Sequence, residues 1–157
     1  MANNNFLFRI NGTREIELAY REPDSISPNL KTDTPPELGM NLNYRWDIDN
    51  NIFVVIVSII FKCKNIEDKD IIVLKFTNIT EYEIKDLNKH FKDLGNGKFE
   101  MNQEIETTVV SVAISGARGM LAGRSAGTYW GKFVIPLIIP SDVILSKKLN
   151  PEKENKV

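Results

Sequence analysis

A nearly unbroken run of β-branched and aromatic residues, Ile52–Cys63, restricts the fold more than any other part of this sequence. Val, Ile and Phe are favoured in strands because their side chains pack well on a pleated surface. The run is too short for a confident helix, and its lack of polar alternation is typical of a strand buried on both faces. We therefore expect Ile52–Cys63 to be the central strand of a sheet, covered on both faces.

Further strands are predicted on either side of the central one. Residues 38–44 alternate between large apolar and small or polar residues, and turn residues follow at 47–51. Charged turn residues at 67–70 lead into another apolar stretch at 71–76. Three successive strands joined by short polar turns form an antiparallel meander.

A fourth strand is expected near the N-terminus. Asn11-Gly12 is a strong turn signal, and residues 15–20 after it alternate between apolar and polar side chains. The Pro-rich stretch 21–36 shows no helical period, so it predicts a long crossover connection to the meander. Connections of this length are often functional.

Two helices are expected after the strands. Apolar residues spaced through Glu81–Leu94, with charges between them, predict a short amphipathic helix. A long helix is expected from Glu104 to Trp130, although each interior glycine costs about 1 kcal/mol relative to alanine. Such a helix must be stabilised by packing. Its glycines are Gly116, Gly119, Gly123 and Gly127.

These elements predict an α+β fold, with a four-stranded antiparallel sheet and a short and a long helix on one face. The 157 residues fit one domain over 1–157, in which 1–5 and 150–157 are expected to be flexible tails. A capping Ser141-Asp142 precedes an apolar segment at 143–149, after the long helix.

Composition excludes several classes of protein. The formal net charge is −1, so there is no overall positive field to attract a nucleic acid. The longest apolar runs fall below the roughly 18–20 residues of a membrane-spanning helix, so no membrane insertion is expected. The first residues lack the basic and apolar regions of a signal peptide, and Cys63 has no partner for an internal disulfide. We expect a cytoplasmic protein.

No constellation of catalytic or metal-binding residues is visible. His90 is the single histidine and is expected on the polar side of the first helix, and Cys63 is expected to be a buried, inert thiol. Residues 116–120 resemble a phosphate-binding loop only faintly, because the following Lys-Ser/Thr is missing. We expect no catalytic residue, no metal and no cofactor, and therefore not an enzyme.

The glycine spacing has two explanations. Gly116, Gly119, Gly123 and Gly127 recur every three or four residues and form a stripe on which another element can approach closely. That element could belong to the same protomer or to a second subunit. Arg118 and Arg124 flank the stripe; each could pair with an acid across an interface, although a solvated position is the simpler expectation.

Several short motifs, in the expected order, resemble the SecB family of protein-export chaperones. Thr-Arg-Glu-Ile at 13–16 resembles the family's Thr-Lys-Asp-Ile at the start of its first strand. Pro-Glu-Leu at 36–38 and Met-Asn-Leu-Asn at 40–43 are similar to its Pro-Glu-Val-x-Leu-Asp-Leu-Asp at the end of the crossover. Residues 115–119 through 133–137, with Pro140, are similar to its long helix and following Pro-x-Leu segment. The resemblance covers roughly residues 6 to 145.

The resemblance implies an ATP-independent holdase that assembles as a homo-oligomer, a dimer or a tetramer, and binds unfolded or partly folded polypeptides in apolar grooves. It implies a subunit interface at Gly116, Gly119 and Gly123, and a possible face for docking the motor SecA at Glu15. The implied groove residues are Ile26, Leu30, Leu38, Met40 and Leu121.

Two departures from the family pattern leave the partner open. Ala19 and Lys75 stand where export members carry acidic residues, so SecA binding and a role in protein export are doubtful. The crossover also lacks the family's aromatic residues. The alternatives to a general holdase are a SecB-like chaperone dedicated to one partner, for example in a toxin–antitoxin system, or an interaction module that is not a chaperone.

Overall fold

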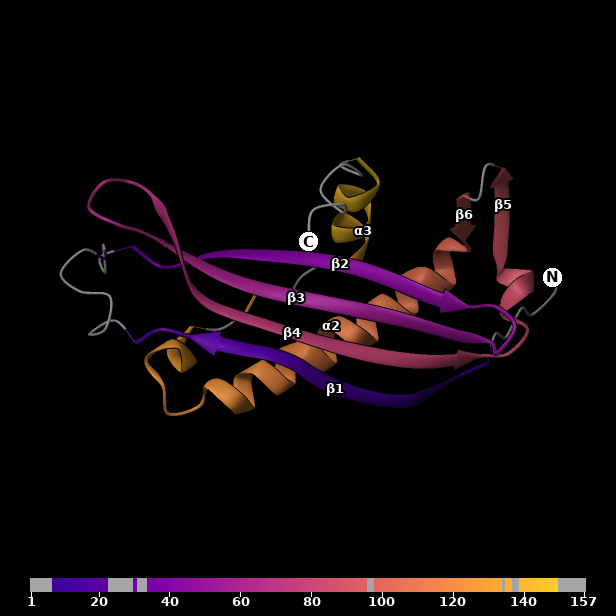
Figure 1. Ribbon diagram of the computed structural model, residues 1–157, viewed down its shortest axis with the longest axis horizontal. Coiled ribbons are helices and arrows are strands. Elements are labelled where there is room, and N and C mark those ends of the chain that lie inside the picture. Colours follow the sequence, from indigo (N-terminus) through magenta and orange to yellow (C-terminus); the bar gives the residue numbers. More distant parts are fainter. Residues whose placement is uncertain are drawn as a thin grey trace.

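The computed structural model describes residues 7–22, 30, 34–95, 98–133, 135–136 and 139–149, with the backbone alone at 93, 95, 98, 99 and 146–149. Its main layer is a four-stranded antiparallel sheet in the order β1-β4-β3-β2, and the helices lie on one face of it (Figure 1). The strands are β1 (Phe8–Tyr20), β2 (Glu37–Asp47), β3 (Ile52–Lys64) and β4 (Asp70–Ile84). The expected α+β fold and the antiparallel meander are therefore confirmed. The crossover leads from β1 to β2 at the opposite edge of the sheet, and β1 pairs with β4.

Strand β3 packs against the helices with every second side chain. Phe53, Val55, Val57 and Ile59 are almost fully buried on this helix-covered face. On the other face Ile52, Val54, Ile56 and Ile60 are half-buried, and no described element covers them. The expectation that both faces of β3 would be covered is wrong. An apolar side chain can be buried under a helix or only partly shielded by its neighbours on adjacent strands, and the sequence of β3 is apolar in both cases. We call this second side the uncovered face; Ile79 of β4 lies on it, opposite Ile56.

The Asn11-Gly12 pair does not form the expected turn. Strand β1 continues through it, and the register with β4 shifts between Ile10 and Gly12. The Asn11 side-chain amide donates to Glu81 at 3.1 Å, which holds the irregularity against β4. A β-bulge accommodates the extra residue within the strand, so turn-forming residues need not reverse the chain.

The expected helix at Glu81–Leu94 is also wrong. Strand β4 continues to Ile84, a 3₁₀ turn η1 follows at Leu87–His90, and β5 (Phe91–Gly95) and β6 (Lys98–Met101) form a separate hairpin. Buried Tyr82 and Ile84 alternate with outward Glu81 and Glu83, a period of two that pairing with β1 and β3 enforces. Backbone pairing on both sides of β4 therefore outweighs the helical spacing of the apolar residues.

The long helix, α2 (Gln103–Ser125), is shorter than expected. The Asn102 side chain caps its first turn by accepting from the backbone N–H groups of Glu104 and Ile105. It ends at Ser125, and Gly127 beyond it has a positive φ of 84°. The 3₁₀ turn η2 (Tyr129–Lys132) and α3 (Pro140–Leu149) follow. The short helix of this fold is thus α3, which contacts both α2 and β2.

A buried tyrosine ties α2 to the C-terminal end of β4. Tyr82 is fully buried on β4, and its hydroxyl donates to the carbonyl of Val109 in α2 at 2.8 Å. Burial raises the pKa of Tyr82, so the hydroxyl keeps its proton at neutral pH and remains a donor. None of the helices built from described residues has both the length and the apolar character needed to span a bilayer.

Replacing Tyr82 by phenylalanine should lower the free energy of unfolding by about 1–2 kcal/mol, because a buried hydrogen bond is lost while the ring is retained. Chemical denaturation measures the change. Tyr20→Phe is the matched control, since the Tyr20 side chain is 46% exposed, and it should be neutral. Equal effects of both substitutions would contradict the assigned role of the hydroxyl.

Candidate functional site

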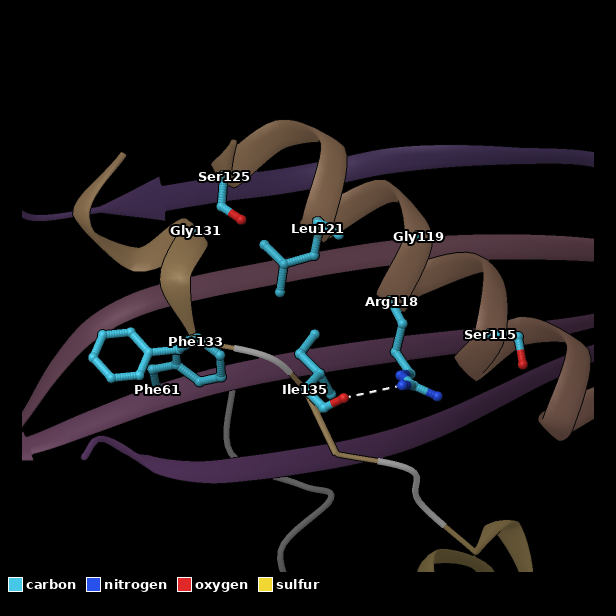
Figure 2. A pocket seen from close by; sticks show the side chains of 10 residues that line it. Phe61, Ser115, Arg118, Gly119, Leu121, Ser125, Gly131, Phe133 and Ile135 are labelled. Atoms are coloured by element: carbon cyan, nitrogen blue, oxygen red, sulfur yellow. Dashed lines mark hydrogen bonds between the residues drawn. The ribbon is translucent and has the colours of Figure 1, made fainter. Parts of the chain in front are cut away.

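A pocket of about 380 Å³ opens between α2, η2 and Ile135, above the end of β3 (Figure 2). Its floor and walls are mainly apolar, because Phe61, Leu121 and Ile135 come together there from three separate segments and are each largely buried. A concave apolar site with few polar groups is the usual form of a binding pocket. Its lining residues are Phe61, Ser115, Arg118, Gly119, Leu121, Ala122, Ser125, Gly131, Phe133 and Ile135.

Gly131 shapes the end of the pocket where η2 folds back onto α2. A Cβ atom added there would lie 2.4 Å from the backbone oxygen of Ser125, so any larger residue would push the two segments apart. The Thr128 hydroxyl donates to the same Ser125 oxygen at 2.8 Å. The end of α2 and the start of η2 therefore form one tightly packed corner.

Aromatic residues hold η2 against the sheet. Trp130 is buried, and its indole N–H donates to the carbonyl of Arg21, just beyond β1, at 2.6 Å. Its ring centroid lies 4.9 Å from that of Tyr129 and 5.8 Å from that of Phe133. Because Phe133 lines the pocket, this cluster fixes one wall relative to β1.

Arg118 joins α2 to the opposite wall. One terminal nitrogen of its guanidinium donates to the carbonyl of Ile135 at 3.0 Å, as Figure 2 shows. Arg118 is half-buried and is the one charged residue that the described part of the chain contributes to the lining. The guanidinium is therefore part of the pocket wall.

The structure places the expected groove residues at different points. Leu121 lines the pocket, whereas Ile26 lies outside the described residues. Leu38 and Met40 lie on β2 opposite Phe61 and Ile59, half-buried against the core and outside the lining. Leu30 forms an isolated bridge with Asn65, at the turn between β3 and β4.

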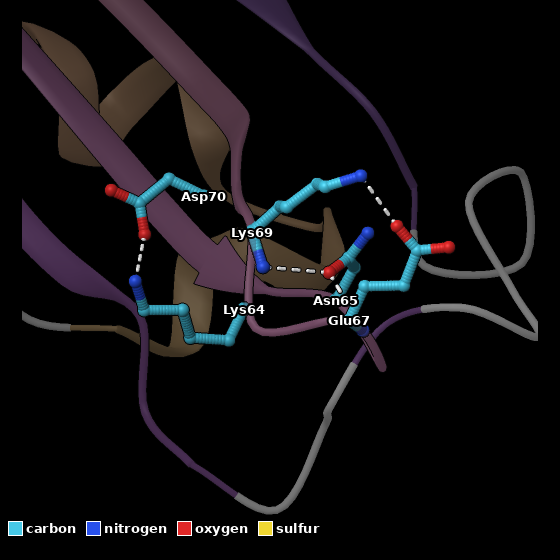
Figure 3. A network of polar contacts seen from close by, with 5 residues as sticks. All are labelled: Lys64, Asn65, Glu67, Lys69 and Asp70. Carbon is cyan, nitrogen blue, oxygen red and sulfur yellow. Dashed lines mark hydrogen bonds and ion pairs between the residues drawn. The ribbon is translucent and has the colours of Figure 1, made fainter.

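That turn is held by a polar network (Figure 3). The Asn65 side-chain oxygen accepts from the backbone N–H groups of Glu67 and Lys69 at 2.9 and 2.8 Å. Lys64 pairs with Asp70, which raises the pKa of the lysine and lowers that of the aspartate. Leu30 therefore pairs with a hydrogen-bonded turn at one end of the sheet.

The glycine stripe lies on an open side of α2. Gly116, Gly119 and Gly123 are exposed, and a Cβ atom added at any of them would meet nothing within 4 Å. Close packing within the protomer is therefore not the reason for these glycines, as far as the described residues show. The subunit contact stays a prediction, and Gly127 lies outside the helix.

Glu15 does not lie on the uncovered face, where docking would be expected. Its carboxylate accepts from Arg124 of α2 at 3.0 Å, so it points to the helix-covered side. Lys75 lies on the uncovered face and pairs with Glu17 at 2.8 Å, opposite the backbone of Ala19. The docking role of Glu15 stays a prediction.

Neither His90 nor Cys63 is among the residues that line this pocket. His90 ends η1 and is not on the polar side of a helix, and its carbonyl accepts from the backbone N–H of Asn102 at 2.8 Å. Cys63 is buried, and burial raises the pKa of its thiol. The described part of the chain brings no three His, Cys, Asp or Glu residues together as a metal site.

Most of the lining was not predicted from the sequence. Arg118 was noted only as a neighbour of the glycine stripe, and Phe133 and Ile135 only as part of an apolar segment after the long helix. Gly131 gave no signal, because its close approach to Ser125 depends on how the chain turns after α2.

Comparisons with known proteins reveal a structural likeness but no sequence family. No family model matches this chain, and no curated protein matches it in sequence. Its structure is similar to that of Rv1957 of Mycobacterium tuberculosis, a SecB-like chaperone in complex with a ChAD peptide from the antitoxin Rv1956 HigA1. The TM-score is 0.52 at 14% identity, over 83% of this chain and 90% of that chain. The chain therefore has a SecB-like α+β fold.

Proposed function

We propose that this protein is a SecB-like chaperone that binds an extended, non-native segment of a dedicated partner protein. The observation that carries the proposal is the apolar pocket between α2, η2 and Ile135 on a SecB-like sheet. An extended segment fits such a site because it can place single apolar side chains into the pocket.

Binding in this proposal is driven by burial of apolar surface and needs neither ATP nor a catalytic residue. One buried Leu or Phe side chain contributes about 1.5–3 kcal/mol, which is too little for stable capture by a single pocket. Linking several pockets in one assembly raises the affinity without new kinds of contact. Self-association through Gly116, Gly119 and Gly123 would supply these additional pockets.

A dedicated partner is favoured over a broad client range. The structurally similar mycobacterial protein was solved with a peptide from an antitoxin, which supports recognition of one defined segment. A general holdase linked to export is the second candidate, since an apolar pocket can accept many sequences. Delivery to SecA has less support, because Lys75 adds positive charge to the uncovered face and its partner Glu17 is thereby neutralised.

Ala122→Trp should block the pocket, because Ala122 is exposed on α2 and lines the opening, so the larger ring has room without straining the core. Affinity capture from the native host should yield one main partner with the wild-type protein and none with this variant. Gln103→Trp, another exposed position of α2 outside the pocket, is the matched control and should retain the partner.

Many captured proteins, all lost with Ala122→Trp, would favour the general holdase. Undiminished capture by Ala122→Trp, with an unchanged melting temperature, would reject the pocket as the binding site.

Gly116→Ala should stabilise the protomer by about 0.5–1 kcal/mol, because a helix-interior glycine is exchanged where nothing opposes a Cβ atom. Gly116→Glu should instead prevent self-association, since a bulky charged side chain would have to be buried where the stripe is expected to contact a second subunit. Sedimentation at micromolar concentration should show a dimer or tetramer for wild type and a monomer for Gly116→Glu. A wild-type monomer would contradict the predicted assembly.

A further inference from the structure

We propose that the pocket selects a partner segment in which an acidic side chain neighbours an apolar one, and that Arg118 binds this carboxylate. The inference rests on the proposed function and specifies the chemistry of the ligand. It follows from the placement of a positive charge in an otherwise uncharged, mainly apolar pocket.

The charge of Arg118 is not neutralised by any described residue. Its one hydrogen bond within the described chain goes to the Ile135 carbonyl, a neutral acceptor, and no described carboxylate forms an ion pair with it. Arg124, further along the same helix, pairs with Glu15 at 3.0 Å. The charge of Arg124 is thus paired with a carboxylate, whereas no described carboxylate pairs with the charge of Arg118.

The geometry leaves most of the guanidinium available. An arginine side chain carries five N–H donors in a planar fork that matches a carboxylate, and the Ile135 carbonyl occupies one of the terminal nitrogens. The same hydrogen bond fixes the guanidinium at the wall of the pocket, so little side-chain entropy remains to be lost when a ligand binds.

A second cation strengthens the preference for negative charge. The Lys132 ammonium lies 3.5 Å from the centroid of the Tyr129 ring and 5.2 Å from that of Phe133, which lines the pocket. With Arg118 in the lining and Lys132 beside it, the pocket would repel a basic side chain.

The apolar walls argue for a peptide over a small anion. Phe61, Leu121 and Phe133 provide surface that a free carboxylate or phosphate would leave uncovered. A neighbouring apolar side chain would fill this space while the carboxylate reaches Arg118. Partial burial also strengthens the ion pair, because screening by water and salt is weaker there than at the surface.

Short peptides test this specificity directly. Three peptides with a common Leu-Phe pair carry Glu, Gln or Lys at the adjacent position, with both ends capped so that no terminal charge remains. Fluorescence anisotropy should show the Glu peptide binding about tenfold more tightly than the Gln peptide, as expected for one charge-assisted contact, and the Lys peptide more weakly than either. A Gln peptide with a free C-terminus tests whether a terminal carboxylate can substitute.

Variants assign the preference to Arg118. Arg118→Gln should bring the Glu and Gln peptides to equal affinity, whereas Arg118→Lys should keep a reduced preference because the charge remains without the planar fork. Arg45→Gln removes the same charge from an exposed position of β2 and should leave the preference unchanged. If Arg118→Gln fails to fold, Arg118→Lys and loss of the preference at high salt still decide the question.

The outcomes separate this inference from the proposed function. Equal binding of the Glu and Gln peptides by wild type would overturn the role of Arg118 and leave the apolar pocket in place. A preference that persists unchanged in a folded Arg118→Gln variant would overturn it as well. Failure of every peptide to bind would overturn this inference, whereas the proposed function is decided separately by capture of the partner with wild type and with Ala122→Trp.

Discussion

The packing of α2 against β3 and β4 is the constraint on which the rest of the structure depends. Alternate side chains of β3 and most inward side chains of β4 form a buried layer under the helix, and the hydrogen bond from Tyr82 to Val109 fixes the N-terminal part of the helix. Once α2 is fixed, its exposed residues Gly119 and Ala122 line the pocket, and Gly116 and Gly123 lie exposed beside it. A helix with little intrinsic stability thus gains its order from the sheet and provides two surfaces for interaction.

The strands could be predicted from the sequence wherever only one periodicity fits. Residues 38–44 alternate strictly, and β2 forms there. Residues 81–94 fit both a helix and a strand, and pairing of Tyr82 with β1 and β3 decides between them, which no local pattern reveals. Similarly, the apolar run of β3 predicted a central strand but not that one of its faces remains uncovered.

The candidate site was less predictable than the fold because its residues come from separate segments. Leu121 was expected in a groove from the family resemblance, and it lines the pocket. Arg118 is held at the pocket by its hydrogen bond to the Ile135 carbonyl, and Gly131 lies there because its backbone packs closely against that of Ser125. Both contacts form only when the chain turns back after α2. The likeness to a SecB-like chaperone shows the fold, and the pocket supplies the reason to propose polypeptide binding.

Hydrogen exchange of the protein with and without its captured partner tests the central claim most directly. Binding in the pocket predicts slower exchange in η2 and in the second half of α2, the segments that line it, and no change in the strands of the uncovered face beyond global stabilisation. Protection confined to β1, β2 and the uncovered face, with α2 and η2 unchanged, would contradict the account.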